Sequence, residues 1–230
     1  MAQIIATRRP ATDLPDREAD VWRAFQGQQP AFANPLMGPD FARAIGRVRD
    51  DAEVVTYRRG DEIVGFLGLH RRPGGFARPL GAPFSDYHAL ITGAAPGMDG
   101  PQALTLAGIG AFRHIGLVDP HGLFPPVGTG PDAFAIETPD GPETHVEAMR
   151  AASPKKFKNW RRLQNRLAEL GPLRFDQSRT RDDLDALLMW KSEQFERTGL
   201  QDVLRPLWVR ALMSDLFQTD TPHFRGLMLT

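Results

Sequence analysis

Apolar and charged positions follow a helical period most clearly in residues 154–170. Ser153 is a favourable N-cap, Pro154 suits the first helical position, and Gly171 followed by Pro172 predicts the end of this helix. At 100° per residue, one arc of the helix is apolar. It consists of Phe157, Trp160, Leu163, Leu167 and Leu170. We expect this arc to be committed to packing.

The opposite arc of the same helix is basic, with Lys155, Lys158, Arg161, Arg162 and Arg166. From Arg150 to Arg166 there are seven basic residues and no acidic one. One interpretation is a solvated cationic face. The other is a surface that binds an anion, either a phosphate-bearing cofactor or an acidic polymer. The candidate anion-binding residues are Lys155, Lys158, Arg161 and Arg162, together with Lys191 and Arg197 on the next predicted helix.

The segment after Gly171 predicts a strand, two helices and a further strand. Residues 173–175 alternate as a short strand, and Thr180 with Asp183 predicts a capping box for a helix that ends at Gly199. The expected buried side of that helix is Leu184, Leu187, Leu188 and Phe195. A third helix starts near Pro206, with Trp208, Leu212 and Leu216 as its packing side. A strand is expected at 224–229, and we expect the chain to end inside a domain.

The preceding residues mix helices and strands. We expect a strand at 3–6, helices at 15–27 and from Pro39, and a hairpin of 53–58 with 63–69 across Gly60. The later predictions are strands at 87–91, 115–118 and 134–136, a helix at 101–113, and linkers at 119–132 and 139–142. This order favours an α/β or α+β fold whose sheet is mixed and partly antiparallel, with flanking helices.

Composition narrows the function classes. The chain has 230 residues, a formal net charge of zero and no cysteine, so disulfides, thiolate zinc sites and a cysteine nucleophile are excluded. A neutral chain has no overall attraction to nucleic acid, and any basic face is local. The first residues lack the apolar core of a signal peptide, and the uncharged run 100–112 is too short to span a membrane. We expect a soluble, cytoplasmic protein.

One cluster of residues could carry proton-transfer chemistry. No P-loop, G-x-S-x-G, H-E-x-x-H or dinucleotide motif is present, and the six histidines lack metal-ligand spacing, so we predict no metal. Asp86, Tyr87 and His88 follow Ser85 where a loop meets a predicted strand. Within a strand, Asp86 and His88 would share a face and Tyr87 would point away. These three are the candidate catalytic residues. The alternative is a polar end of a loop with one buried tyrosine.

Several short stretches, in order, resemble a known family. They are residues 64–67, 81–88, 152–156, 171–175, 190–192 and 197–199. Together they resemble GNAT-superfamily acyltransferases of bacterial cellulose or exopolysaccharide biosynthesis, which are described as having a BioF-like acetyltransferase domain. The resemblance extends from about residue 30 onward.

The resemblance implies tandem GNAT-like units. The first would span 1–140, and the second, an incomplete acyltransferase unit, 141–230. It also implies acetyl-CoA or another acyl-CoA as donor, and an amine or hydroxyl acceptor. In such folds backbone N–H groups polarise the thioester carbonyl and a base removes the acceptor's proton. The superfamily's usual phosphate loop, Arg/Gln-x-x-Gly-x-Gly/Ala, does not occur in this sequence.

Two other functions remain open. The chain could be a non-catalytic module whose basic helix holds an acidic polysaccharide or RNA, or a structural half that needs a C-terminal partner. RNA has little support, because Trp160 lies on the apolar arc whereas nucleic-acid surfaces interleave aromatic residues with the charges. We therefore expect no nucleic-acid partner. The acceptor, the acyl group and the oligomeric state stay open.

Overall fold

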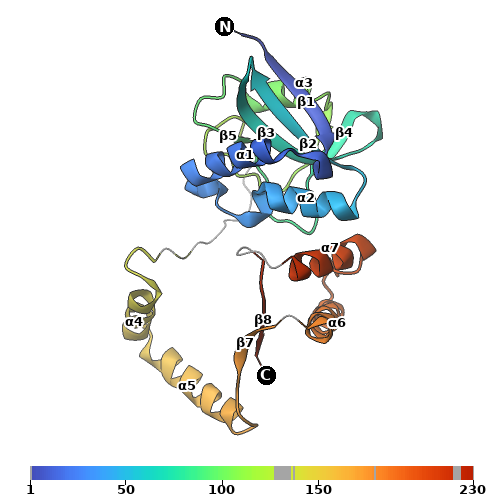
Figure 1. Cartoon of the computed structure of the whole chain (residues 1–230). Helices are drawn as coiled ribbons and strands as arrows, with labels where there is room; N and C mark the ends of the chain where they lie inside the picture. The colour runs from blue at the N-terminus through green and yellow to red at the C-terminus, as the bar shows by residue number, and fades with distance from the viewer. Residues whose placement is uncertain (1, 127–135, 137, 179, 220–223, 230) are drawn as a thin grey trace. The chain divides into compact units, whose positions relative to one another are not determined.

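The computed structural model describes residues 2–126, 136, 138–178, 180–219 and 224–229. Figure 1 shows its helices and strands. Contacts divide the chain into two units. The first contains residues 1–128 and 179–225, and the second contains residues 129–178 and 226–230. Helices and a mixed sheet make this an α/β protein, as predicted. The division of the sequence into domains near residue 140 stays a prediction.

A mixed sheet forms the centre of the first unit. In its described residues the strands run in the order β1-β2-β3-β4-β6, and β5 also pairs with β3. All pairings are antiparallel except that of β4 with β6. The strands are β1 (Ile4–Pro10), β2 (Ala52–Arg59), β3 (Glu62–Arg71), β4 (Phe76–Pro79), β5 (Ile91–Thr92) and β6 (Ala111–Phe112). The predicted hairpin is confirmed as β2 and β3, and Gly60 at its turn has the positive φ of 60° that glycine adopts without strain.

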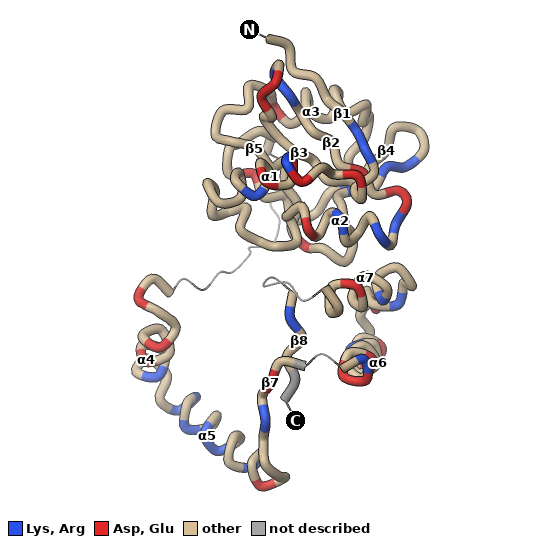
Figure 2. The backbone as a smooth tube through the Cα atoms, in the orientation of Figure 1, with Lys and Arg blue, Asp and Glu red and all other residues tan. Residues whose placement is uncertain are grey.

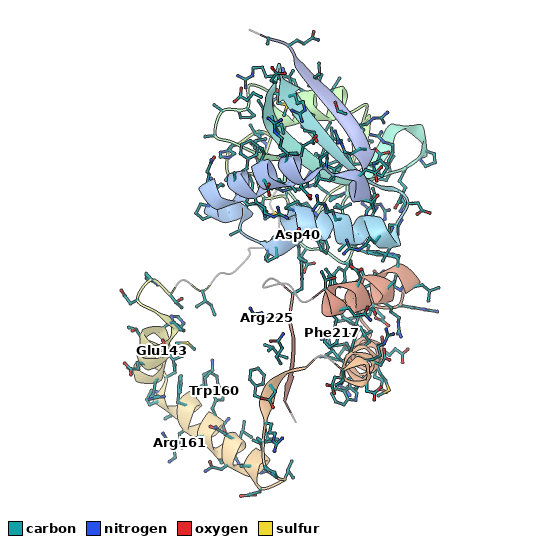
Figure 3. The ribbon with its side chains drawn as sticks, in the orientation of Figure 1. Asp40, Glu143, Trp160, Arg161, Phe217 and Arg225 are labelled. Atoms are coloured by element: carbon teal, nitrogen blue, oxygen red, sulfur yellow. The ribbon has the colours of Figure 1, made fainter. Side chains whose placement is uncertain are left out.

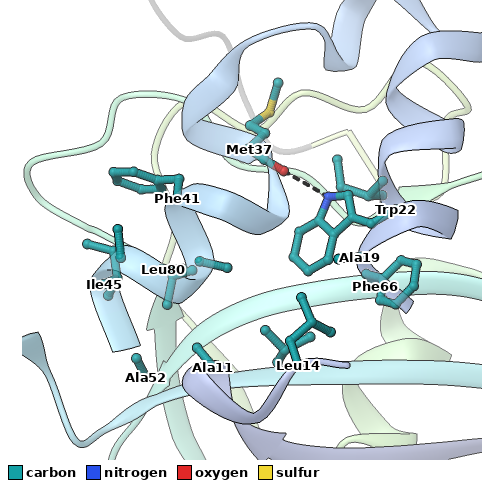
Figure 4. Packing of buried hydrophobic residues seen from close by; sticks show 14 of the residues in the cluster. Ala11, Leu14, Ala19, Trp22, Met37, Phe41, Ile45, Ala52, Phe66 and Leu80 are labelled. Atoms are coloured by element: carbon teal, nitrogen blue, oxygen red, sulfur yellow. Dashed lines mark hydrogen bonds between the residues drawn. The ribbon is translucent and has the colours of Figure 1, made fainter. Parts of the chain in front are cut away.

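Alternating residues of β2 and β3 bury both faces of the sheet. Val54 and Phe66 lie on the face covered by α1 (Asp16–Gln28) and α2 (Pro39–Val48). On this face the Trp22 ring stacks on Phe66 at 4.9 Å, and its indole N–H donates to the Met37 carbonyl at 3.0 Å (Figure 4). Such alternation on two buried faces is what keeps the register of the strands fixed.

The opposite face of the sheet is covered by α3 (Gly100–Leu106). Tyr57, which is fully buried there, donates its hydroxyl to the Ala103 carbonyl at 2.9 Å. Burial raises the pKa of this phenol. The side chain of Asp99 caps α3 with Gln102 in a capping box, and Gly108 with φ of 67° follows the helix. The predicted helix over 101–113 is therefore too long, because a left-handed glycine interrupts it before β6.

Two later helices, α6 (Arg181–Thr198) and α7 (Leu207–Gln218), complete the first unit. Thr180 caps α6 as predicted, and Gly199 ends it in the left-handed conformation. Leu212 and Leu216 of α7 join the apolar cluster that contains the buried side of α2. Arg47 of α2 makes a bidentate ion pair with Asp215 of α7, at 3.0 and 2.6 Å. Leu187, expected to be buried, is exposed on α6.

The second unit contains α4 (Pro142–Ala152), α5 (Pro154–Ala168) and a pair of antiparallel strands, β7 (Phe175–Ser178) and β8 (Gly226–Leu229). Helix α5 confirms the predicted helix. Its apolar arc, however, is exposed from Trp160 to Leu170, so the expectation that this arc is committed to packing is wrong for the described structure. Helix α4 was not predicted, and it begins at Pro142, the last residue of the predicted linker 139–142, because proline suits the first position of a helix as well as a loop.

One order of elements occurs twice in the chain. The first occurrence is strand, helix, helix, strand in β1, α1, α2 and β2, and the second is the same order in β7, α6, α7 and β8. In each case the outer two strands pair antiparallel. The sequence shows no repeat, so the recurrence is visible only in the structure.

Candidate functional site

The ladder along β3 is interrupted where the candidate catalytic residues lie. β4 pairs with the end of β3 at Leu69–Arg71, and β5 pairs with its start at Gly65 and Phe66. Between them residues 81–90 leave the sheet as a loop. Just before this loop, the Leu80 N–H donates a hydrogen bond to the Gly68 carbonyl of β3 at 3.3 Å. An interrupted ladder leaves room beside the sheet for side chains that arrive from the loop.

A turn at Gly81 shapes this loop. Gly81 has φ of 78°, and the N–H groups of Phe84 and Ser85 donate to its carbonyl at 2.8 and 3.0 Å. A Cβ atom at this position would lie 2.9 Å from a ring carbon of Phe41. The Ala82–Pro83 peptide bond is cis. Only glycine combines this conformation with so close an approach to α2.

The side chain of His70, on β3, holds the Gly81 turn through a hydrogen bond. Its Nε2 accepts the Gly81 N–H at 2.9 Å, so Nδ1 carries the proton and donates to Asp51 at 3.0 Å. Burial lowers the pKa of His70 to about 4, so the ring is neutral at pH 7. Arg49 and Arg72 both pair with Asp51, and although burial opposes them, these cations hold its pKa below the ordinary value.

His70 and Asp51 were not predicted as site residues from the sequence. Alternation along β3 could have placed His70 on the same face as Phe66 and Gly68, which is a buried face. The contact with Gly81 depends on tertiary structure, and no local signal predicts it.

His88 is the most buried of the predicted catalytic residues, at 7% exposure. Its backbone N–H donates to the Gly116 carbonyl, and its carbonyl accepts from the Val118 N–H, at 3.1 and 2.8 Å. Among the described residues, its Nε2 is buried and has no hydrogen-bond partner. Burial lowers the pKa of His88 to about 4, and a hydrogen bond with the Ser85 backbone acts in the opposite direction. The ring is neutral at pH 7, and its buried Nε2 is available to a hydrogen-bond partner.

A small cavity of about 30 Å³ lies beside His88. Its lining comes from α1, the 35–37 turn, β3 and the loop, and consists of Trp22, Leu36, Met37, Gly68, Leu80, Tyr87, His88 and Ala89. The indole N–H of Trp22 is already bonded to the Met37 carbonyl. The volume suits one small polar group, such as a water molecule or the tip of a hydroxyl or amine.

Tyr87 and Asp86 are placed differently. Tyr87 lines the cavity and is 36% exposed, so its ring connects the cavity wall with solvent. Asp86 is exposed, whereas His88 is buried. Of the predicted strand 87–91 only Ile91 lies in a strand, β5, and His88 makes an isolated bridge with Leu117. The structure therefore does not put Asp86 and His88 on one face, because the segment follows a loop path and lacks strand alternation. That bridge is also all that forms of the predicted strand 115–118, and most of 134–136 lies outside the described residues.

The predicted anion-binding residues fall in both units. Lys155, Lys158, Arg161 and Arg162 line one shallow surface of α5, in the second unit. Figure 2 shows basic positions along the length of this helix. Lys191 and Arg197 are on α6, in the first unit, where the Lys191 ammonium donates to the Gln194 side chain at 2.9 Å. The four α5 cations thus share one surface of the second unit, and the α6 pair belongs to the first unit.

Comparison with known families bears on the C-terminal third of the chain. Residues 154–230 match the family model described as acetyltransferase (GNAT) domain. This supports the GNAT superfamily for the segment that contains α5, α6 and α7. No curated protein and no solved structure matches the chain. GNAT domains generally use acyl-CoA as donor, so the match suggests acyl transfer.

Two further findings concern cofactors and membranes. Within the part of the chain that the structure describes, no three His, Asp or Glu side chains gather as a group that could hold a metal ion. The described helices include none with both the length and the apolar character needed to cross a bilayer.

Proposed function

We propose that this protein transfers an acyl group, most simply acetyl, from acyl-CoA to an amine or hydroxyl acceptor in exopolysaccharide or cell-envelope biosynthesis. The observation that carries the proposal is the GNAT match at residues 154–230. The repeated strand-helix-helix-strand order supports tandem GNAT-like units, because both copies pair their outer strands in the same way. The biosynthetic setting rests on the resemblance of the short sequence stretches alone.

The proposed reaction breaks the thioester carbon–sulfur bond and forms a carbon–nitrogen or carbon–oxygen bond to the acceptor. The acceptor loses a proton and the released thiolate gains one. When bound, acyl-CoA supplies the activated acyl group. His88 accepts a hydrogen bond from the acceptor's O–H or N–H at its free Nε2. With a pKa of about 4 it is a weak proton acceptor at pH 7, so its contribution is to orient the nucleophile.

The other predicted site residues have proposed roles in binding the acceptor and the donor of this acyl transfer. The Tyr87 hydroxyl donates a hydrogen bond to the acceptor at the solvent side of the cavity. The exposed Asp86 binds the acceptor before the acceptor enters the cavity. The cations Lys155, Lys158, Arg161 and Arg162, with Lys191 and Arg197, attract the donor's phosphates or an acidic acceptor. Support for the α5 cations comes from the absence of any acidic residue between Arg150 and Arg166.

Release of free thiol from acetyl-CoA tests the proposal. The purified chain is mixed with acetyl-CoA and a panel of amino sugars, hydroxyl sugars and amines, and thiol is followed with and without each acceptor. Acceptor-dependent release is expected, and His88→Gln should lower kcat/KM about tenfold, the worth of one hydrogen bond at the reacting group. His145→Gln, the same substitution on α4, is the control and should not lower it. Thiol release that no acceptor stimulates would contradict the proposal.

A non-catalytic binding module is the alternative, and the basic arc of α5 favours it. In that case the chain binds an acidic polysaccharide through this arc and releases no thiol. Binding to alginate is measured at increasing salt concentrations and compared with the thiol assay. Salt-sensitive binding without acceptor-dependent thiol release supports the binding module.

A further inference from the structure

Helix α5 presents two exposed surfaces of opposite character. Its apolar arc is open to solvent, with Trp160 43% exposed, Leu163 46% and Leu167 38%. Its other arc carries the cations Lys155, Lys158, Arg161, Arg162 and Arg166. Figure 3 shows Trp160 and Arg161 leaving different sides of the helix. A solvated helix needs only the polar surface, so the exposed apolar arc requires a separate explanation.

The aromatic residues near the start of α5 are arranged with cations around them. The rings of Phe157 and Trp160 lie 4.8 Å apart. The Lys156 ammonium lies 4.9 Å from the Trp160 ring, and the Arg150 guanidinium lies 5.6 Å from the Phe157 ring. Lys156 is the one cation whose helical angle falls within the apolar arc, and its long side chain brings its charge back beside an aromatic ring. This combination of aromatic rings and reaching cations is typical of the boundary between water and a lipid layer.

We propose that α5 binds the surface of an anionic lipid membrane, lying flat with its apolar arc among the acyl chains and its cations among the lipid phosphates. Lipid phosphates are then the anion that the α5 cations bind, so this proposal rests on the anion-binding role proposed for them above. Amphipathic helices that lie in a membrane interface combine a strongly basic face, a face of Trp, Phe and Leu, and low overall hydrophobicity. Helix α5 has all three properties.

Other occupants explain only one of the two surfaces. An acidic polymer would contact the cations and leave Trp160 and Leu163 in water. A second copy of the chain could cover the apolar arc, but it would bring two helices together that each carry basic residues and no acidic residue from Pro154 to Ala168. An anionic lipid surface satisfies both arcs at once.

Vesicle sedimentation tests the proposal on the full chain without acyl-CoA. The protein should sediment with vesicles of phosphatidylcholine and phosphatidylglycerol in equal amounts, and should stay in solution with phosphatidylcholine alone. Arg161→Gln with Arg162→Gln should weaken binding roughly thirtyfold, from the typical attraction of a basic residue to an anionic leaflet. Raising the salt should weaken binding of the unchanged protein. Since the thiol assay contains no lipid, the two proposals can fail separately.

The apolar arc is tested by a second pair of substitutions. Leu163→Ser with Leu167→Ser should weaken vesicle binding at least tenfold, because two inserted side chains lose their apolar environment. Leu187→Ser, at an exposed leucine of α6, is the matched control and should bind as the unchanged protein does. Circular dichroism confirms that each variant keeps its helices. Equal binding by the Leu163/Leu167 variant would show simple polyanion attraction and overturn the proposal, as would no sedimentation with the anionic vesicles.

Tryptophan quenching gives a readout of depth that does not depend on affinity. Vesicles with brominated acyl chains should quench the fluorescence of the bound protein, and Trp160→Phe should remove most of that quenching. Quenching that Trp160→Phe leaves unchanged would overturn the proposal, because another tryptophan would then be the one in the lipid.

Discussion

His70 and His88 are both neutral at pH 7, because burial lowers the pKa of each to about 4. An unfolded histidine titrates near 6.5, so between these values the unfolded chain binds more protons than the folded chain. Stability is therefore fully present above pH 6.5 and declines as the pH falls toward 4. From pH 7 to pH 5 we expect a loss of about 2 kcal/mol for each of the two histidines.

Urea unfolding at pH 7, 6 and 5 measures this loss. In His88→Gln the decline between pH 7 and pH 5 should be about half as large, because one of the two titrating groups has been removed. Equal declines in the two proteins would mean that His88 does not titrate on unfolding as its burial requires.

Gly81 is the residue that the turn of the candidate site depends on. In Gly81→Ala the new Cβ would sit in a left-handed conformation and 2.9 Å from the Phe41 ring. We expect a loss of about 2 to 3 kcal/mol in the free energy of unfolding, from backbone strain and overpacking together. Urea denaturation at pH 7 measures it. A loss below about 1 kcal/mol, less than the strain alone, would contradict the tight packing of this turn.

At the scale of the element, the ends of helices are set by glycine and by caps. Gly199 ends α6 with φ of 67°, and no other atom lies within 4 Å of the position of a Cβ. Gly199→Ala should therefore cost about 1 kcal/mol through backbone conformation alone.

Gly27 is the matched control for that substitution. It lies inside α1, also with no neighbour within 4 Å, but its φ is not positive. Gly27→Ala should stabilise the protein by up to about 1 kcal/mol, because alanine favours the helix. Thermal unfolding of both variants compares them, and shifts in the same direction would contradict the assignment of Gly199 as a left-handed cap.

The elements that the sequence predicted well are those with strong local signals. Pro154, Thr180, Gly199 and the Gly60 turn each mark a boundary by their own chemistry, whereas Ser153 occupies the N-cap position of α5 without a side-chain capping hydrogen bond. The errors lie where the local signal was weak or competed with tertiary structure. Apolar residues up to 113 suggested a continuing helix across Gly108, and Pro142 was read as part of a linker although it begins α4.

The candidate site was predicted in part. The polar residues of the 85–88 loop were found from their types, and the structure places Tyr87 and His88 at one cavity. The support from His70 and Asp51 could not be found, because it joins residues that are 11 to 30 positions away from Gly81. The exposure of the α5 apolar arc could not be predicted either, since a helical pattern indicates which face is apolar but not what covers it.

At the scale of the whole molecule, α7 belongs to the core of the sheet-containing unit. Leu212 is fully buried in the same cluster as Ala42 and Ile45 of α2. Leu212→Ala should lower the free energy of unfolding of the first unit by about 2 to 5 kcal/mol, as expected when a buried leucine leaves a cavity. Hydrogen exchange of the β2 and β3 amides should become faster by the factor that corresponds to this loss of stability.

Leu163→Ala is the comparison for this substitution. Leu163 is exposed on α5 and buries little, so its removal should leave exchange in β2 and β3 unchanged. Equal effects of the two substitutions would contradict the assignment of α7 to the first unit.

The first unit is built from two separate stretches of chain, and this has a consequence for how the protein is made. Synthesis proceeds from the N-terminus, and a domain that is continuous in sequence can fold as soon as it has left the ribosome. Here the first 128 residues emerge with the α7-facing side of α2 uncovered, while the ribosome adds some fifty residues of the other unit. Until α7 is translated, Arg47 lacks its ion-pair partner Asp215. Ala42 and Ile45 likewise lack their apolar neighbour Leu212. The nascent chain thus carries an apolar surface through that interval, which is the stage at which a chaperone would have most to bind.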